Sequence, residues 1–142
     1  WHRGVMARTA FVDAGPSVYP IGVTRDGAVH LHEKGRSADG APFAWFIETA
    51  DSYLDPENTL LVRGVWPDFR DQAGPVTVGL VGRMHPQDAE LVSQSVIISP
   101  GEAKADLLAA ARLFRLRFSG ESAPTGCRIG RTTFDVAPAG RL

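Results

Sequence analysis

Cysteine is nearly absent from the chain, since Cys127 is the only one among 142 residues. A single cysteine excludes an internal disulfide and any zinc site built from several cysteines, so the sequence is not that of a disulfide-stapled secreted domain. Lysine is almost as scarce, with only Lys34 and Lys104 against thirteen arginines. Cytoplasmic assembly is the expected setting of such a chain.

Long apolar runs are also missing. No stretch approaches the eighteen or so apolar residues of a membrane-spanning helix, so no membrane span is expected. The composition, 44% hydrophobic and 22% charged, is that of an ordinary folded protein, and 142 residues fit one domain. We therefore expect one β domain over residues 1–142. Because the first residue is Trp1, that domain is expected to be processed or to be a piece of a longer chain.

Helical periodicity is rare, whereas glycine and proline are frequent, with fifteen and ten residues. They divide the sequence into short apolar stretches separated by turn signals, which predicts an all-β fold. The expected architecture is an antiparallel β-sandwich or a partly open barrel, with a hairpin turn at Asp26-Gly27. The expected strands cover 8–13, 19–23, 28–33, 43–49, 59–65, 75–83, 93–99, 113–119 and 127–136.

The segment before residue 112 is the exception to this pattern. Ser99 and Glu102 have the spacing of a capping box, Pro100 suits a first helical position, and strong helix formers follow. We therefore allow at most one short helix, near 100–111. From about 112 the alternation of apolar and basic residues in "LFRLRF" has a period of two, which indicates a strand with one wet face.

The apolar positions of the expected strands predict the core. Two further segments, "DSYLDPEN" (51–58) and "PDFRDQAG" (67–74), are expected to be surface turns. The predicted core residues are Phe11, Val29, Leu31, Phe46, Leu61, Val78, Leu80, Ile97, Phe114, Leu116, Phe118, Ile129 and Phe134.

A metal site is the first chemical possibility. His30 and His32 stand two residues apart with Glu33 directly after them. In a strand the two histidines point to one face and Glu33 to the other, so this triplet is a poor set of three ligands. The favoured interpretation is a polar strand face, with metal binding by His30 and His32 as the alternative.

Covalent catalysis has no support in the sequence. Cys127 lacks the flanking signature of a nucleophile, no G-x-S-x-G elbow occurs, and "GLVGR" lacks the lysine of a phosphate-binding loop. The acids of the turns, such as Asp55, are interpreted as backbone caps. No enzymatic activity, no cofactor and no small-molecule substrate are predicted, while the residues themselves leave a glycosidase-type pair of carboxylates open, with nothing that selects it.

Two tryptophans and four arginines are candidate surface residues. Trp45 and Trp66 are candidates for a sugar-stacking platform, although aromatic residues in strands are more often core or subunit interface. After residue 111 six arginines face only Glu121 and Asp135, which makes this part of the chain basic. The candidates for a DNA-facing stripe on adjacent strands are Arg115, Arg117, Arg128 and Arg131. The alternatives are ion pairs across a subunit boundary with acids such as Asp51, Asp55 or Asp71, or a solvated face.

The order of several segments carries a resemblance. The segments are "RTAFVDAG", "YPIGVTRDGAVHLHEKG", "PDFRDQAG", "GRMHPQD" and "LFRLRFSGESAPTGCRIGRTTFDVAPAGRL". In this order they resemble the C-terminal part of the tail nozzle, or packaged-DNA stabilisation, proteins of short-tailed bacteriophages and related prophages. The chain departs from that pattern at "AARLF" and at Cys127, where the family pattern has a tryptophan.

The resemblance implies a non-enzymatic virion protein, assembled in the bacterial cytoplasm, that forms a homo-oligomeric ring around a DNA channel and contacts other virion proteins. Non-specific contact with DNA fits this role, and His32 and Glu33 would be structural residues at a hairpin end. Two other functions stay open from the residues themselves: a carbohydrate-binding β-sandwich module and, less favoured, a cupin-like metal enzyme.

Overall fold

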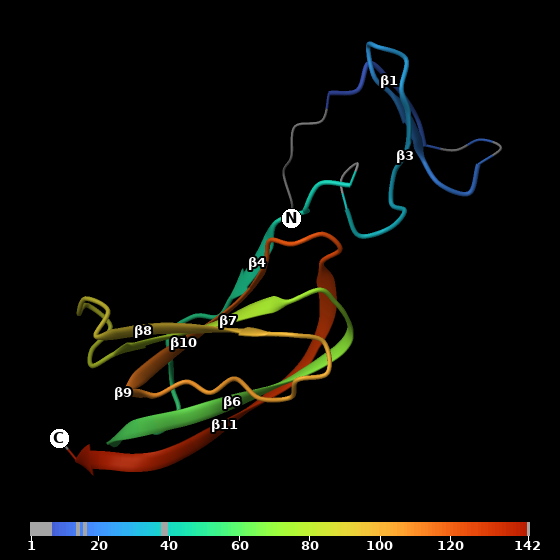
Figure 1. Cartoon of the computed structure of the whole chain (residues 1–142). Coiled ribbons are helices and arrows are strands. Elements are labelled where there is room, and N and C mark those ends of the chain that lie inside the picture. The colour runs from blue at the N-terminus through green and yellow to red at the C-terminus, as the bar shows by residue number, and fades with distance from the viewer. Residues whose placement is uncertain (1–6, 14, 16, 38–39, 142) are drawn as a thin grey trace.

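A computed structural model describes residues 7–13, 15, 17–37 and 40–141. Within these residues the chain forms eleven strands in three antiparallel sheets, none of them closed into a barrel, and contains no helix (Figure 1). This confirms the predicted all-β class and the antiparallel β-sandwich. In the described part of the chain there is consequently no helix able to cross a membrane.

Two of the three sheets face each other as the layers of the sandwich (Figure 1). The first sheet contains, in order, β4 (Trp45–Glu48), β10 (Leu113–Gly120), β7 (Val76–Arg83) and β8 (Val92–Ile98), and β10 also pairs with β5 (Ser52–Tyr53). The second sheet contains, in order, β11 (Gly126–Arg141), β6 (Asn58–Ala73) and β9 (Ala109–Ala111).

The core lies between these layers and follows the period of two along the strands. On β7, and on β10 from Phe114 onward, every second residue is buried, which is the pattern that "LFRLRF" predicted. Phe69 of β6 meets Phe118 of β10 edge to face, with ring centroids 5.7 Å apart. The largest fully buried side chains are Val62, Val65, Val76, Val78, Leu80 and Ile98.

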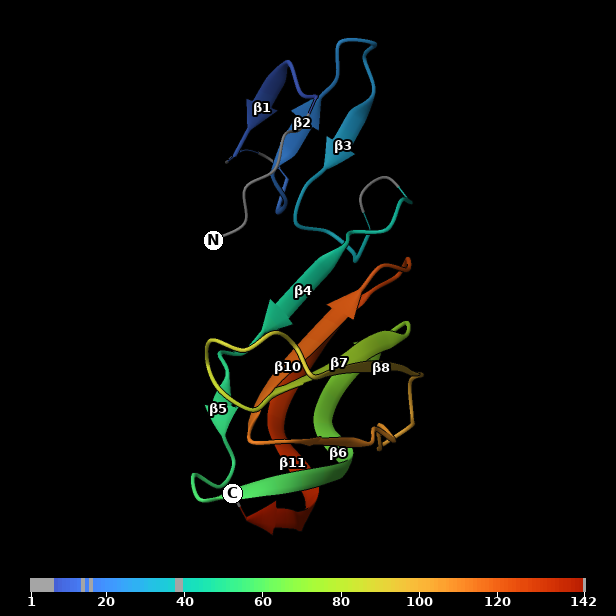
Figure 2. The same ribbon diagram turned by 90° about the vertical axis from the view of Figure 1, so that its left-hand side faces the viewer.

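The third sheet stands apart from the sandwich, on the N-terminal side of β4 (Figure 2). This N-terminal sheet contains, in order, β1 (Ala10–Val12), β2 (Ile21–Val23) and β3 (Val29–Leu31). The predicted Asp26-Gly27 turn joins β2 to β3: Gly27 has a φ of 87°, and its N–H donates to the Thr24 carbonyl at 3.0 Å. That residues 1–142 are a single domain stays a prediction.

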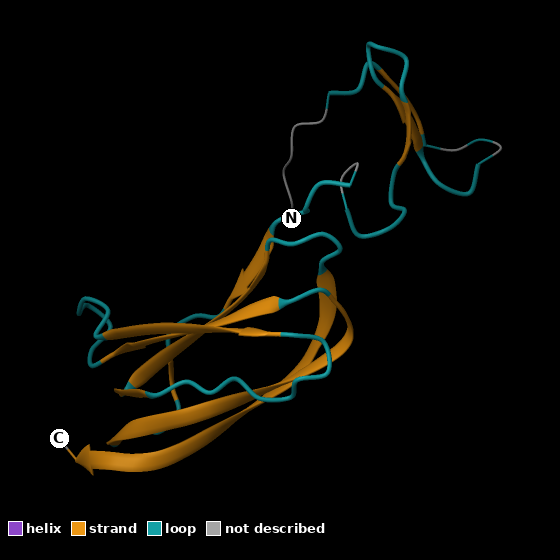
Figure 3. Cartoon of the chain, in the orientation of Figure 1, coloured by secondary structure: helices purple, strands orange, loops and turns teal. Residues whose placement is uncertain are grey.

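The short helix allowed near 100–111 does not form, because this segment is extended (Figure 3). The N–H and C=O of Ala105 exchange hydrogen bonds with those of Val65, at 2.8 and 2.9 Å, and 109–111 forms β9 along β6. Ala105, Leu107, Ala109 and Ala111 are buried in alternation. Burial of these small side chains beside β6 outweighs the helix propensity of the alanine run.

One hydrogen bond of the expected capping box is present, from the Ser99 N–H to the Glu102 carboxylate, with Oε2 at 2.6 Å. The Glu102 N–H donates instead to the Ser99 backbone carbonyl, at 3.1 Å, and not to its hydroxyl. These bonds close a turn between β8 and the extended segment after it. The sequence signal was therefore correct for the local turn and wrong for the conformation of residues 103–111.

Five residues of the predicted core are exposed instead. Phe11, Val29 and Leu31 belong to the N-terminal sheet, which lies outside the sandwich. Phe46 and Ile97, with exposed fractions of 62% and 64%, lie in the sandwich but on the outer face of the first sheet. The predicted core residues that are buried are Val78, Leu80, Phe114, Leu116 and Phe118, and those partly buried are Leu61, Ile129 and Phe134.

The segment 67–74 is not a surface turn, because β6 continues through it to Ala73. A proline inside a long strand is tolerated here because the register between β6 and β11 shifts between Ile129 and Thr132, next to Pro67. The segment 51–58 contains the short strand β5, which the sequence did not predict.

Candidate functional site

Two of the four candidate arginines lie side by side on the outer face of the first sheet. Arg115 and Arg117 alternate on β10 with the buried Phe114, Leu116 and Phe118, so they project away from the core. This is the arrangement that the alternation predicted. Their partners therefore lie on the outer face.

Those partners are carboxylates of the same chain. Arg115 Nη2 lies 2.5 Å from Glu90 Oε1, and its Nε lies 3.9 Å from Asp51 Oδ1. Arg83 at the end of β7 shares both acids, with its Nη2 3.3 Å from Glu90 Oε1 and its Nε 3.5 Å from Asp51 Oδ2. Four charges of alternating sign thus meet at one end of the outer face.

Glu48 of β4 extends this group toward Arg117. Its two carboxylate oxygens lie 3.6 Å from Arg115 Nε and 3.6 Å from Arg117 Nη1. The Arg117 guanidinium also lies over the Phe46 ring, with its carbon 4.3 Å from the ring centroid. The outer-face cluster thus has three cations and three anions: Glu48, Asp51, Arg83, Glu90, Arg115 and Arg117.

Arg128 and Arg131 lie on β11, in the other sheet of the sandwich. The four candidate arginines therefore do not form one stripe on adjacent strands, because β10 and β11 belong to different layers. Arg128 pairs with the carboxylate of Asp71, while Arg131 is exposed where the register of β11 shifts.

Three of the six arginines after residue 111, namely Arg115, Arg117 and Arg128, pair with acids from earlier in the chain. Asp51 and Asp71, which one alternative placed across a subunit boundary from these arginines, pair with Arg115 and Arg128 within the chain. Arg112 donates to the Pro56 carbonyl at 2.9 Å. The charge count along the sequence therefore overstates how basic this part of the surface is, because acids distant in sequence lie beside these arginines in the fold.

Trp45 and Trp66 do not form a joint platform, because they lie in different sheets. Trp45 packs against the core, and its Nε1–H donates to Thr125 Oγ1 at 3.0 Å. Trp66 faces outward, but the Lys104 ammonium lies 5.0 Å from its ring centroid. Of these two, Trp66 is the more exposed.

His32 is a packing residue of the N-terminal sheet. Its ring lies over Gly22, where a Cβ would come within 2.5 Å of Nε2, and meets Phe11 edge to face at 5.2 Å. Arg8 Nε–H donates to His32 Nε2 at 3.4 Å. Across the described residues no three His, Cys, Asp or Glu side chains come together as a metal site would need.

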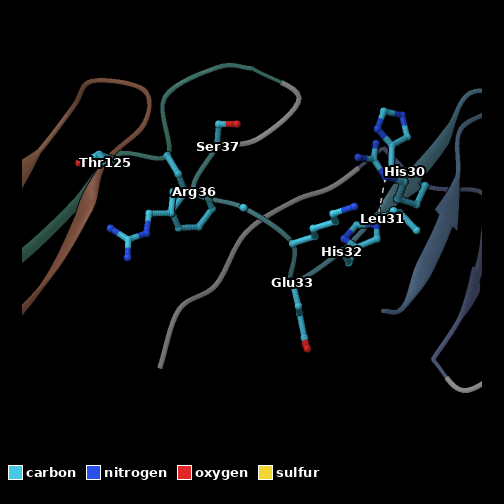
Figure 4. Close-up of a pocket in the computed structure, with 11 residues that line it drawn as sticks. His30, Leu31, His32, Glu33, Arg36, Ser37 and Thr125 are labelled. Atoms are coloured by element: carbon cyan, nitrogen blue, oxygen red, sulfur yellow. Dashed lines mark hydrogen bonds between the residues drawn. The ribbon is translucent and has the colours of Figure 1, made fainter. Parts of the chain in front are cut away.

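A pocket of about 430 Å³ lies where the N-terminal sheet meets the sandwich. Arg36 crosses this junction: its Nη1–H donates to the Asp71 carbonyl at 2.6 Å, and its carbonyl accepts from the Thr125 N–H at 3.4 Å. In Figure 4 the side chains of His30, Glu33 and Arg36 point in different directions. They have no common point at which a ligand would be held.

The Cys127 thiol is half-buried on β11. Burial raises its pKa, which the nearby Arg36 offsets in part. A thiol with a raised pKa stays protonated near neutral pH and is a poor nucleophile. The side chain packs against the core, and its position is that of a packing residue.

Asp55 is a capping residue whose contribution to folding stability is expected to depend on pH. Its carboxylate accepts from the Asn58 side chain at 3.0 Å and from the Glu57 N–H at 2.8 Å, and these bonds hold the pKa of Asp55 below its ordinary value. Because the pKa of Asp55 is lower in the folded chain, its stabilising effect is fully present at pH values above its pKa in the unfolded chain, near 4. The effect is lost as the pH falls through its pKa in the folded chain. We expect Asp55→Ala to lower Tm slightly at pH 7 and by less at pH 3. Equal losses in calorimetry at both pH values would contradict this.

The feature that the sequence did not reveal is a set of exposed apolar surfaces. In the N-terminal sheet, one face consists entirely of aliphatic side chains; this aliphatic face comprises Ala10, Val12, Ile21, Val23, Val29 and Leu31. The edge strand β4 exposes Phe46 and Ile47, and β8 exposes Ile97. The only sequence signal was the alternation in the first three strands, which fits a core face equally well.

No protein-family model matches the chain, and no curated protein matches it significantly. The function is therefore inferred from the surfaces of this molecule.

Proposed function

We propose that the chain is a structural subunit of a phage-type particle, a tail or head-to-tail component that assembles with copies of itself into a ring around a DNA passage. The observation that carries the proposal is the presence of separate exposed apolar surfaces on different parts of the chain. Large apolar side chains are exposed on the N-terminal sheet, on β4 and on β8.

Separate apolar surfaces favour more than one neighbour for each subunit. A contiguous apolar surface is usually covered by another molecule, and a binding protein with one ligand needs only one such surface. A ring needs at least two different surfaces on every subunit, because each subunit contacts the next through unlike patches. This requirement supports an assembly over a sugar-binding module, because Trp45 and Trp66 lie in different sheets and do not form one stacking platform.

The outer-face cluster suits a passage through which DNA slides. Affinity for DNA comes mainly from cations that neutralise phosphates and release counterions. Arg83, Arg115 and Arg117 are already paired with carboxylates, so this surface attracts phosphate weakly. The contact with DNA in this proposal is therefore diffuse and independent of sequence.

Electron microscopy of the purified chain in negative stain, together with light scattering, tests the proposal. Ring-shaped oligomers with a central opening are the expected result. A monomer at every concentration would contradict the proposal. Saturable oligosaccharide binding that is lost in Trp66→Ala would replace it by the sugar-binding function.

A further inference from the structure

We propose that the aliphatic face of the N-terminal sheet packs against the same face of a second copy of the chain. This inference rests on the proposed function, since it takes self-association as the role of the exposed apolar surfaces. It adds one defined contact to the assembly and names the partner of that contact.

The pairing of the strands separates the side chains of the sheet into two faces. Paired residues in an antiparallel sheet point to the same side. Phe11, Gly22 and His30 are paired in one row and share the face on which His32 lies. The rows on either side of it, Ala10–Val23–Val29 and Val12–Ile21–Leu31, point to the opposite face and contain only aliphatic side chains.

This face is exposed where a stable sheet would be covered. Val12, Val29 and Leu31 have exposed fractions of 53%, 66% and 44%. The strands are only three residues long, and so small a sheet gains stability mainly by burying an apolar face. The sandwich does not supply that cover, because the three residues stay exposed in its presence.

The chemistry of the face favours an identical face as its partner. Its six side chains include no polar group, so they cannot specify a polar or charged ligand. Two identical copies meet without like charges opposing each other, and two stacked sheets about 10 Å apart form a six-stranded sandwich. Charged residues are found in the turn between β2 and β3, at Arg25 and Asp26, and are of both signs.

The size of the face predicts a weak contact. The six aliphatic side chains, of which Ile21 and Val23 on the central strand are less exposed than the other four, present on the order of 300 Å² of apolar surface per copy. The pair would bury roughly 600 Å², about half of what stable complexes bury. We therefore expect pairing at high concentration, strengthened where other contacts hold the copies together. A contact between identical faces has a two-fold axis, so it joins subunits of two rings rather than neighbours within one ring.

Sedimentation of the full chain from about 10 µM to about 1 mM measures this pairing, with Val29→Asp as the test variant and Val18→Asp as its control. Val18 lies just before β2, outside the aliphatic face, and is 94% exposed. Val29→Asp buries a carboxylate in the contact, so we expect pairing at least about tenfold weaker, whereas Val18→Asp should pair as the parent does. Equal pairing of both variants would overturn the inference.

A crosslink provides a second measurement that does not require an unfavourable charge. In a Cys127→Ser background, a single cysteine is placed on the central strand as Val23→Cys, or outside the face as Val18→Cys. A short bis-maleimide should link two copies through position 23 much faster than through position 18, because two copies of the central strand face each other in the stack. Equal rates at the two positions would overturn the inference.

The possible results distinguish a failure of the sheet-to-sheet contact from a failure of the proposed ring assembly. Rings that form equally well in the parent and in Val29→Asp, with no preferred crosslink at position 23, would reject the stacked faces and leave the proposed assembly standing. A parent that forms neither rings nor pairs would reject both. Pairs that depend on Val29, seen together with rings, support both.

Discussion

Replacing both Arg115 and Arg117 by alanine is expected to lower the free energy of unfolding by about 1–3 kcal/mol while leaving the retention of DNA unchanged. In the double variant Asp51 and Glu90 keep Arg83 as their partner within the outer-face cluster, whereas Glu48 keeps none there. The side chain of Arg115 is only 21% exposed, so water screens its ion pairs less than it screens those of an ordinary surface arginine.

Urea denaturation of the purified chain measures this loss, and salt provides an internal check. Repulsion among the remaining carboxylates weakens as ionic strength rises, so the deficit of the double variant should shrink in high salt. Arg70→Ala is the matched control, because Arg70 forms a single exposed pair with Asp68 at 3.3 Å and should contribute less than about 1 kcal/mol.

Two other outcomes would show that the arginines have a different role. A double variant as stable as the parent that assembles but no longer retains DNA would show that the arginines face DNA. A stable variant that no longer assembles would show that they lie at a subunit boundary. Either result would contradict the prediction that the cluster mainly stabilises the chain that contains it.

The arrangement of this cluster could not be read from the sequence, although its residue types could. The alternation in β10 correctly placed Arg115 and Arg117 on one face, because strand geometry is local. Glu90, a partner of Arg115, is 25 positions from it, and Asp71 is 57 positions from Arg128. Such pairs depend on which strands become neighbours, and a charge count along the chain has no information on that.

The register of the strands explains the errors in the predicted core. Phe46 and Ile47 are both large and apolar, as are Ile97 and Ile98, so the sequence does not show which of each pair points inward. A shift by one residue exchanges the two faces of a strand. In the fold Phe46 pairs with Ser119 and Ile97 with Thr77, which places both on the outer face.

The extended segment before β10 shows a second limit of local patterns. Residues 102–111 favour a helix by composition, yet Ala105, Leu107, Ala109 and Ala111 are buried beside β6 with a period of two. Alanine fits both a helix and a closely packed strand, so tertiary packing decides between them. The exposure of the aliphatic face could not be predicted for a related reason. The sequence of a three-residue strand shows that apolar residues alternate, but it does not show whether another part of the chain covers them.

Phe118→Ala is expected to cost about 3–5 kcal/mol, a large part of the 5–15 kcal/mol that stabilises a typical domain. Phe118 is buried between the layers, where its ring meets Phe69 of the opposite sheet. Phe46→Ala is the matched control from the neighbouring strand β4: its ring is 62% exposed and carries the Arg117 guanidinium, so its loss should cost less than about 1 kcal/mol. The sequence predicted both phenylalanines as core residues, and urea denaturation compares the loss of unfolding free energy in the two variants.

Similar losses for the two variants would mean that β4 buries Phe46, in a subunit contact or through a different register on β10. A large loss for Phe118→Ala alone would support both the register and the exposed aromatic surface on which the proposed assembly depends.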